Sequence, residues 1–235
     1  TLLMPTSPTG AYHFDEPFHF RPIDSGHIFS LESYYLSAAD RTNAPVIKMT
    51  NPQFLLSADT NKKTTLTFEK GTYNTYDPEG TPVAGRFFVI GGAWMPAEIV
   101  FLEGTSLRAG SVMCKMNNDG DRLAFLGGTH RFFGKFEFCG MGSRFKRSVY
   151  LDVAGGADLA VQSLEFGTIN AYPKTNDVKE MKFYLRVSDG ATLRTTEGNI
   201  SFPQGFLFLH MTNGTLRSSG SVNFASDLLT TQKVV

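Results

Sequence analysis

The chain has 235 residues, 41% of them hydrophobic, which is enough for one domain with a sizeable core and excludes wholesale disorder. Its 22 Lys and Arg balance 22 Asp and Glu, so it lacks the basic field with which a general nucleic-acid-binding protein attracts phosphates. The 21 Phe and 23 Gly, with only 19% charged residues, favour a protein built of strands and turns.

The first 26 residues are rich in Pro and aromatic residues and carry no internal repeat. A stack of repeats needs its open ends covered, because strand edges and core would otherwise meet water. We therefore expect residues 1–26 to form an N-terminal cap and residues 226–235 a C-terminal tail or cap. His13, Asp15 and His19 carry metal-ligating groups, but such spacings are common by chance in loops. We predict no metal site and no cofactor.

A degenerate unit recurs through residues 27–225, and each copy contains a marker glycine. The markers are Gly71, Gly104, Gly128, Gly156, Gly190 and Gly214, which lie 24 to 34 residues apart. Apolar residues stand five and three places before each marker, as do Ile99 and Phe101. A second alternating pair, such as Val112 and Cys114, usually follows eight and ten places after it. Alternation with a period of two is typical of half-buried strands.

Each unit thus supplies two or three short strands that cannot bury an apolar face alone, and stacking the units in parallel aligns those positions into interior ladders. The sequence therefore predicts an all-β fold, a right-handed single-stranded parallel β-helix of about five to six coils. The alternative is an antiparallel β-sandwich, whose strands also alternate and end in glycine turns. A sandwich does not require the same offsets in every unit.

The units differ in length mainly at one turn, between the second strand of one unit and the first strand of the next, which encloses six to eighteen residues. In a stack, equivalent turns share one edge, and loops on a rigid scaffold tend to carry function. This long-loop edge is a candidate site for a glycan or an anionic polymer, and a solvated edge without a ligand is the alternative that we favour. Its candidate residues are Asn117, Asp119, Asp121, Arg122, Arg144, Lys146, Arg147, Tyr172 and Lys174.

Outward strand positions carry Glu137, Asp152, Glu165 and Arg186. Glu137 and Glu165 each lie nine places after their marker glycine, so they are expected to stand on neighbouring coils. Paired carboxylates are what a glycan-cleaving enzyme requires. Scattered surface charge is the alternative explanation of the same pattern.

The two cysteines, Cys114 and Cys139, are too few for a disulfide scaffold. They lie in adjacent units, but ten and eleven places after their marker glycines. Successive strand residues face opposite ways, so we expect Cys114 inside, Cys139 outside and no disulfide between them.

Residues 101–110, 153–159 and 211–220 resemble the repeats of autotransporter-type passenger domains, and the resemblance extends over about residues 60–225. It is architectural, and no family active site maps onto the chain. It implies a secreted β-helix of a bacterial cell surface and an extracellular location.

Two functions follow as expectations. The preferred one is a non-enzymatic surface or secreted β-helix protein, an adhesin or structural passenger, that binds a glycan or a host or cell-surface ligand at the long-loop edge. The alternative is a polysaccharide lyase or glycoside hydrolase of β-helix fold, with Glu137 and Glu165 as catalytic residues. No nucleic-acid partner and no membrane insertion by this segment are expected.

Overall fold

A computed structural model gives the structure of the protein. It describes residues 11–14, 19–20, 28–29, 46–50, 53–55, 64–68, 71–76, 81, 83–90, 96–116, 118–140, 147–167, 181–202 and 205–224. Within these residues every regular element is a β-strand, which confirms the all-β prediction.

The strands form two sheets. Sheet A contains β1 (Ala11–Phe14), β2 (His19–Phe20), β4 (Val46–Thr50), β5 (Gln53–Leu55), β7 (Gly71–Tyr76), β8 (Arg86–Ile90), β10 (Thr105–Ala109), β11 (Ser111–Met116), β13 (Thr129–Gly140), β15 (Asp158–Phe166), β17 (Thr192–Thr195), β18 (Ile200–Phe202), β20 (Thr215–Arg217) and β21 (Val222–Phe224). Sheet B contains β3 (Ile28–Phe29), β6 (Thr64–Phe68), β9 (Ala97–Phe101), β12 (Arg122–Phe125), β14 (Ser148–Val153), β16 (Lys182–Ser188) and β19 (Phe206–Thr212).

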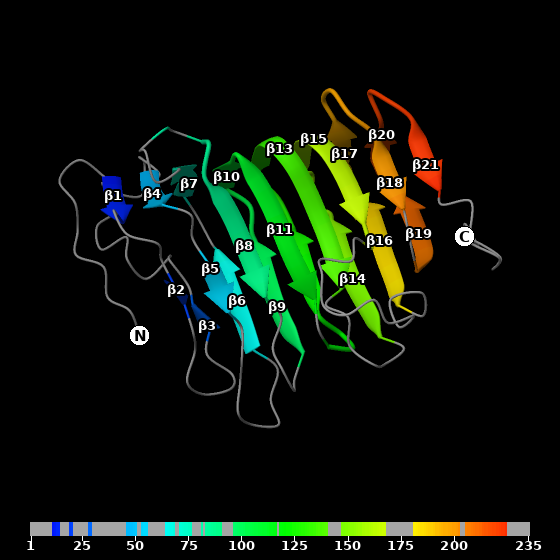
Figure 1. The fold of residues 1–235 in the computed structure, drawn as a ribbon, viewed down its shortest axis with the longest axis horizontal. Helices are drawn as coiled ribbons and strands as arrows, with labels where there is room; N and C mark the ends of the chain where they lie inside the picture. The colour runs from blue at the N-terminus through cyan, green and yellow to red at the C-terminus, as the bar shows by residue number, and fades with distance from the viewer. Residues whose placement is uncertain are drawn as a thin grey trace.

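The chain alternates between the sheets, with one strand in sheet B followed by one or two in sheet A. Sheet B keeps the chain order from β3 to β19, and Figure 1 shows its strands side by side along the long axis of the molecule. In sheet A, the two short strands β10 and β11 both pair with the long strand β13. Every pairing between described strands is parallel, so the antiparallel alternative is wrong.

The register of sheet B matches the offsets counted from the marker glycines. One ladder of directly paired residues runs through Leu66, Ile99, Leu123, Leu151, Leu185 and Leu209. A second runs through Phe68, Phe101, Phe125, Val153, Val187 and Met211. In sheet A, Cys114 pairs with Phe138, and Phe138 pairs with Phe166. The predicted pairing of equivalent apolar positions is therefore confirmed.

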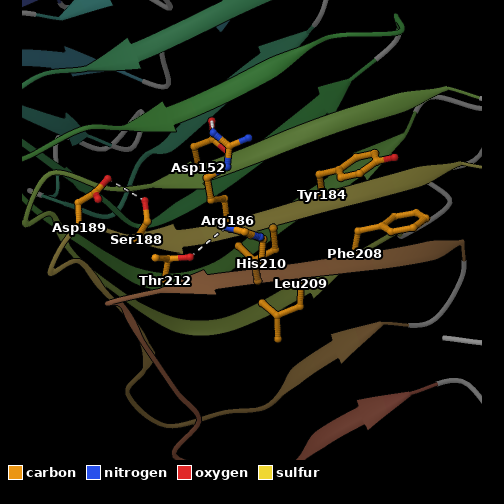
Figure 2. A pocket seen from close by; sticks show the side chains of 10 residues that line it. Asp152, Tyr184, Arg186, Ser188, Asp189, Phe208, Leu209, His210 and Thr212 are labelled. Carbon is orange, nitrogen blue, oxygen red and sulfur yellow. Dashed lines mark hydrogen bonds and ion pairs between the residues drawn. The ribbon is translucent and has the colours of Figure 1, made fainter. Parts of the chain in front are cut away.

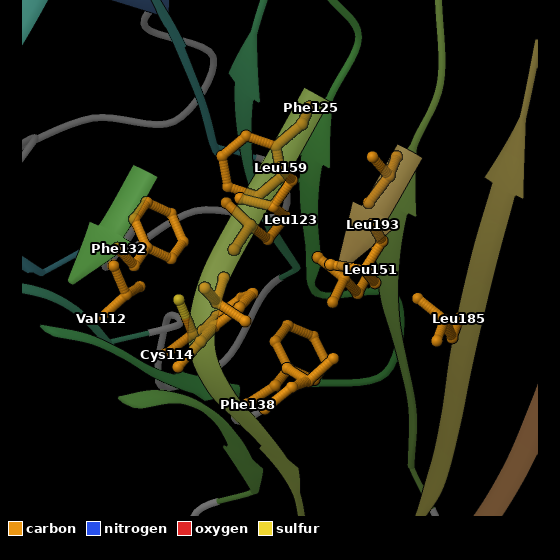
Figure 3. Packing of buried hydrophobic residues seen from close by; sticks show 14 of the residues in the cluster. Val112, Cys114, Leu123, Phe125, Phe132, Phe138, Leu151, Leu159, Leu185 and Leu193 are labelled. Carbon is orange, nitrogen blue, oxygen red and sulfur yellow. The ribbon is translucent and has the colours of Figure 1, made fainter. Parts of the chain in front are cut away.

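Apolar side chains from both sheets meet in one buried cluster, part of which is drawn in Figure 3. The rings of Phe68, Phe101 and Phe125 stack along it, with centroids 4.5 Å apart in the first pair and 5.0 Å apart in the second. Burying each such side chain contributes about 1.5–3 kcal/mol relative to leaving it in water. The column of rings therefore joins neighbouring strands through packing as well as through backbone hydrogen bonds.

Two strands lie inside the segment predicted to be a cap. β1 pairs with β4 and β2 pairs with β5, both in parallel, so the ladders begin before residue 27. Residues 226–235 lie outside the described part of the chain. The division into 1–26, 27–225 and 226–235 stays a prediction.

The register also places the two cysteines one position apart, because Cys139 pairs with Lys115 and not with Cys114. The side chain of Cys114 is fully buried in the core, as predicted. The side chain of Cys139 lies outside what the structure describes.

Candidate functional site

The predicted long-loop edge is described only in part. Asn117, Arg144, Lys146, Tyr172 and Lys174 lie outside the described residues. The part that is described is the turn before β12 and the start of β14. Ligand binding at this edge stays a prediction.

In that turn, polar side chains hold the backbone together. Asp121 is fully buried, and its Oδ2 accepts a hydrogen bond of 2.8 Å from the backbone N–H of Asn118. The Oδ1 of Asp119 accepts one of 2.7 Å from the N–H of Ser148, and Arg147 donates one of 3.2 Å to Asn118 Oδ1. The contacts of Asp119 and Arg147 fasten the turn to the start of β14, and the contact of Asp121 closes the turn itself, so all three residues have a structural use.

Arg122 points away from this turn, onto the outer face of sheet B. Its Nε donates a hydrogen bond of 2.6 Å to Asp152 Oδ2, and its Nη1 donates one to Glu98 Oε1. Burial lowers the pKa of Arg122, but the hydrogen bonds to Glu98 and Asp152 outweigh this effect and raise the pKa overall. Arg122 is therefore a fixed cation between two carboxylates.

Glu137 and Glu165 pair directly in the ladder between β13 and β15, as the prediction required. The Nζ of Lys135 lies 3.0 Å from Glu137 Oε1 and 2.5 Å from Glu165 Oε2. Burial lowers the pKa of Lys135, but the hydrogen bonds to Glu165 and Glu137 outweigh it and raise the pKa overall. One cation thus forms an ion pair with each of the two carboxylates, which gives the cluster a structural explanation. A catalytic role of Glu137 and Glu165 stays a prediction.

A pocket of about 530 Å³ opens on the outer face of sheet B, over β16 and β19 (Figure 2). Outward-facing residues of these two strands pair directly and form three rungs across it. The rungs are Tyr184 with Phe208, Arg186 with His210, and Ser188 with Thr212. Asp152 of β14 and Asp189, just after β16, complete the polar lining. The pocket therefore has an aromatic end, a charged centre and a hydroxyl end.

The aromatic end terminates a stack of rings. The ring centroids of Tyr150 and Tyr184 are 4.8 Å apart with an interplanar angle of 17°, and those of Tyr184 and Phe208 are 4.6 Å apart with an angle of 12°. Within the described residues β19 is the last strand of sheet B, and Phe208 is the last ring of this series. Among the described residues, no further ring stacks on the other face of Phe208.

The charged centre contains a buried acceptor. Asp152 is only 2% exposed, and its Oδ2 accepts the hydrogen bond from Arg122, with Arg186 Nη1 at 3.7 Å. Its Oδ1 has no hydrogen-bond partner within the described part of the chain. A buried acceptor left without a donor costs about 1–3 kcal/mol, so such groups are rare unless they serve a purpose.

The hydroxyl end is polar, with Thr212 exposed and Ser188 buried. Ser188 Oγ donates a hydrogen bond of 2.9 Å to Asp189 Oδ2, and Thr212 Oγ1 lies 3.1 Å from His210 Nε2. These groups can rotate to donate to or accept from a ligand at little cost.

Sequence reasoning noted Asp152 and Arg186 as outward positions but missed the aromatic rung. Tyr150, Tyr184 and Phe208 each come directly before an inward-facing leucine of the first interior ladder. Their shared position, one place before the inward-facing leucine in each unit, therefore predicts a second ladder that faces outward.

No protein-family model, curated protein or solved structure matches the chain. The resemblance to autotransporter-type passenger domains stays a prediction. No helix among the described residues is long and apolar enough to cross a membrane. The same residues contain no group of three or more His, Cys, Asp or Glu side chains that could hold a metal ion.

Proposed function

We propose that the chain is a right-handed single-stranded parallel β-helix of a surface-displayed or secreted bacterial protein, and that it acts by binding. The parallel ladders support the β-helix, since the chain returns to each sheet in turn and equivalent apolar residues pair from one round to the next. A parallel connection of this kind is nearly always right-handed. The architectural resemblance of residues 60–225 to passenger domains favours the extracellular location.

The observation that carries the binding role is the pocket over β16 and β19. Its lining combines stacked rings, an ion-paired centre and two hydroxyl groups on a sheet. Pockets with apolar walls and a few well-placed polar groups are the usual form of ligand sites. The ligand class that we propose is a glycan or another cell-surface molecule, bound on the broad face of sheet B, with the long-loop edge as an additional contact surface.

The second candidate function, glycan cleavage, is favoured by the direct pairing of Glu137 with Glu165. The shared contact with Lys135 gives the pair a structural explanation, so we place binding first. A glycan array read together with an assay for reducing ends and unsaturated products separates the two functions. We expect binding without turnover. Turnover that Glu137→Gln or Glu165→Gln abolishes, in a variant that still folds, would establish the enzyme instead.

A further inference from the structure

We propose that the outer face of sheet A binds an extended anionic polysaccharide, one whose sugar residues carry carboxylate or sulfate groups. The contact is a column of arginines that crosses β10, β13, β17 and β20. This face is a second binding surface of the chain, on a different sheet from the pocket over β16 and β19.

The parallel register of sheet A brings four arginines into one column. Arg108 of β10 pairs with Arg131 of β13. Arg194 of β17 pairs with Arg217 of β20. Ala160 of β15 is the partner of both Arg131 and Arg194, so it takes the middle place of the same column. We call the four arginines the arginine ladder, and in Figure 1 their strands follow one another along the long axis of the molecule.

The arginine ladder faces away from the core. Leu107 and Ala109 belong to the buried cluster, and because successive side chains of a strand alternate, Arg108 between them points outward. Arg108 and Arg217 are exposed, and the side chains of Arg131 and Arg194 are 31% and 33% accessible. All four side chains can therefore be reached from solvent.

One carboxylate lies at the middle of the ladder. Asp158 of β15 accepts hydrogen bonds of 2.6 Å from Arg131 Nη2 and 2.5 Å from Arg194 Nη1. Burial raises the pKa of Asp158, but the hydrogen bonds and charges of these two arginines outweigh that effect and lower the pKa overall. Within the described part of the chain, neither Arg108 nor Arg217 forms an ion pair. The face therefore keeps an excess of positive charge, although the whole chain has none.

This excess of one sign works against the stability of the sheet. Like charges directly opposite each other on neighbouring strands are destabilising, and each end of the arginine ladder is such a pair. The outer face of sheet B has the opposite arrangement, since Glu98, Arg122 and Asp152 alternate in sign on successive strands. An anionic ligand would supply the negative charge that sheet A lacks.

The groups beside the ladder fit a sugar chain. An exposed ring, Phe133, lies next to Arg108, whose guanidinium carbon is 5.7 Å from the ring centroid. Such a ring can pack against the apolar carbon face of a sugar, and hydroxyl side chains can exchange hydrogen bonds with sugar hydroxyl groups. Hydroxyl side chains stand two places before each arginine, on the same face of the sheet, at Ser106, Thr129, Thr192 and Thr215.

The spacing and the chemistry favour a polysaccharide over a nucleic acid. Neighbouring strands lie about 4.8 Å apart, which is close to the length of one sugar residue in an extended chain. The fork of a guanidinium group matches the paired oxygens of a carboxylate or sulfate. A single-stranded nucleic acid needs a row of rings on which successive bases stack, whereas the described residues beside the ladder provide one exposed ring, Phe133.

The test is isothermal titration calorimetry with the whole chain at low ionic strength. The anionic probes are oligogalacturonate and alginate oligosaccharides, which carry carboxylates, and heparin oligosaccharides, which also carry sulfates. Single-stranded and double-stranded DNA oligonucleotides are the competing polyanions. We expect at least one anionic saccharide to bind with a Kd of about 0.1 mM or tighter, more tightly than either DNA, and more weakly as salt is added.

Two variants remove the arginines that have no ion pair. Arg108→Gln and Arg217→Gln should each weaken saccharide binding about fivefold. The two residues lie four strands apart, about 19 Å, so a ligand that spans the ladder should lose the product of the two factors in the double variant. The melting temperature of the double variant should not fall, because the changes relieve repulsion between like charges.

Lys182→Gln is the matched control. It also removes one positive charge, but from β16 of sheet B and outside the pocket, so the affinity should stay unchanged. Thermal melting of each variant establishes that it folds. If Arg108→Gln fails to fold, Arg217→Gln carries the test.

Three results would overturn the inference. They are no binding of any anionic saccharide, tighter binding of DNA than of every anionic saccharide, and saccharide binding that the folded arginine variants weaken no more than Lys182→Gln does. The second result would assign the ladder to a nucleic acid, and the third would place the saccharide elsewhere on the chain. The pocket over β16 and β19 is unaffected by each of them.

Discussion

The buried imidazole of His130 makes the stability of the fold depend on pH. His130 pairs with Leu159, and Leu159 pairs with Leu193, so an imidazole occupies a place in an interior column of leucines. Its Nδ1 accepts a hydrogen bond of 3.2 Å from the N–H of Leu107, and its Nε2 donates one of 2.9 Å to the carbonyl of Gly127. The bond from Leu107 requires the neutral ring, because a protonated ring has no acceptor, whereas the bond to Gly127 is compatible with either form.

Burial lowers the pKa of His130 to about 4 from its ordinary value of 6.5. As the pH falls, the unfolded chain therefore takes up this proton before the folded chain does. The stabilising contribution of the neutral His130 is fully present above pH 6.5. It is lost as the pH falls from 6.5 to about 4, and no further loss follows below pH 4. Its full size is about 3 kcal/mol, of which about 2 kcal/mol is lost between pH 7 and pH 5.

Urea unfolding at pH 7 and pH 5 measures this loss. The comparison variant is His130→Gln, whose amide donates and accepts hydrogen bonds but does not titrate. We expect the free energy of unfolding of the native chain to fall by about 2 kcal/mol more than that of the variant. Equal losses in the native chain and in His130→Gln would refute the reasoning.

Two further predictions concern the core and the turns. Phe125→Ala leaves a cavity in the ring column and should lower the free energy of unfolding by about 3–5 kcal/mol. Phe133→Ala at the surface should lower it by less than about 1 kcal/mol. Equal losses of the two variants in urea unfolding would contradict the described column. A Cβ at Gly110 would overlap the backbone carbonyl of Ala84, while one at Gly156 meets nothing within 4 Å and only the positive φ of 72° opposes it. Gly110→Ala should therefore lower the melting temperature more than Gly156→Ala, which costs about 1 kcal/mol; the reverse order would show that the close approach at Gly110 is not real.

The pairing partners in the core were predictable from the sequence, because their offsets from a glycine are constant. Counting five and three places before each marker finds the residues that pair in sheet B, from Leu66 to Leu209. This works because the side chains of a strand alternate with a period of two and the parallel ladders keep equivalent positions in register.

His130 was not predictable by the same count, because that count applies only to apolar residues. The unit marked by Gly128 has no leucine where its neighbours have Leu107 and Leu159, and His130 fills that place instead. An imidazole can replace an apolar side chain in a core when both of its nitrogens are hydrogen-bonded, and a pattern of hydrophobicity does not contain that information.

The candidate site differs from the predicted edge for a related reason. Loop length directed attention to residues such as Asp121, but a polar loop residue can face a ligand or satisfy the backbone of its own turn. Asp121 does the latter, since it is fully buried against Asn118. The pocket lies instead over the outward-facing residues of β16 and β19, which pair directly. Its aromatic rung can be predicted only when the outward positions of the units are aligned in the same way as the inward ones.

The ion-paired residues on the outer face of sheet B have a consequence for assembly. Glu98, Arg122, Asp152 and Arg186 stand on four successive strands, and their signs alternate. One interior ladder of those strands contains only isoleucine and leucine, so that ladder alone would tolerate a strand that paired with the strand beyond its true neighbour. Such an error would bring Glu98 near Asp152 and Arg122 near Arg186, and repulsion between like charges on adjacent strands would disfavour it. The charged outer face thus helps to enforce the strand order where one interior ladder is uniform.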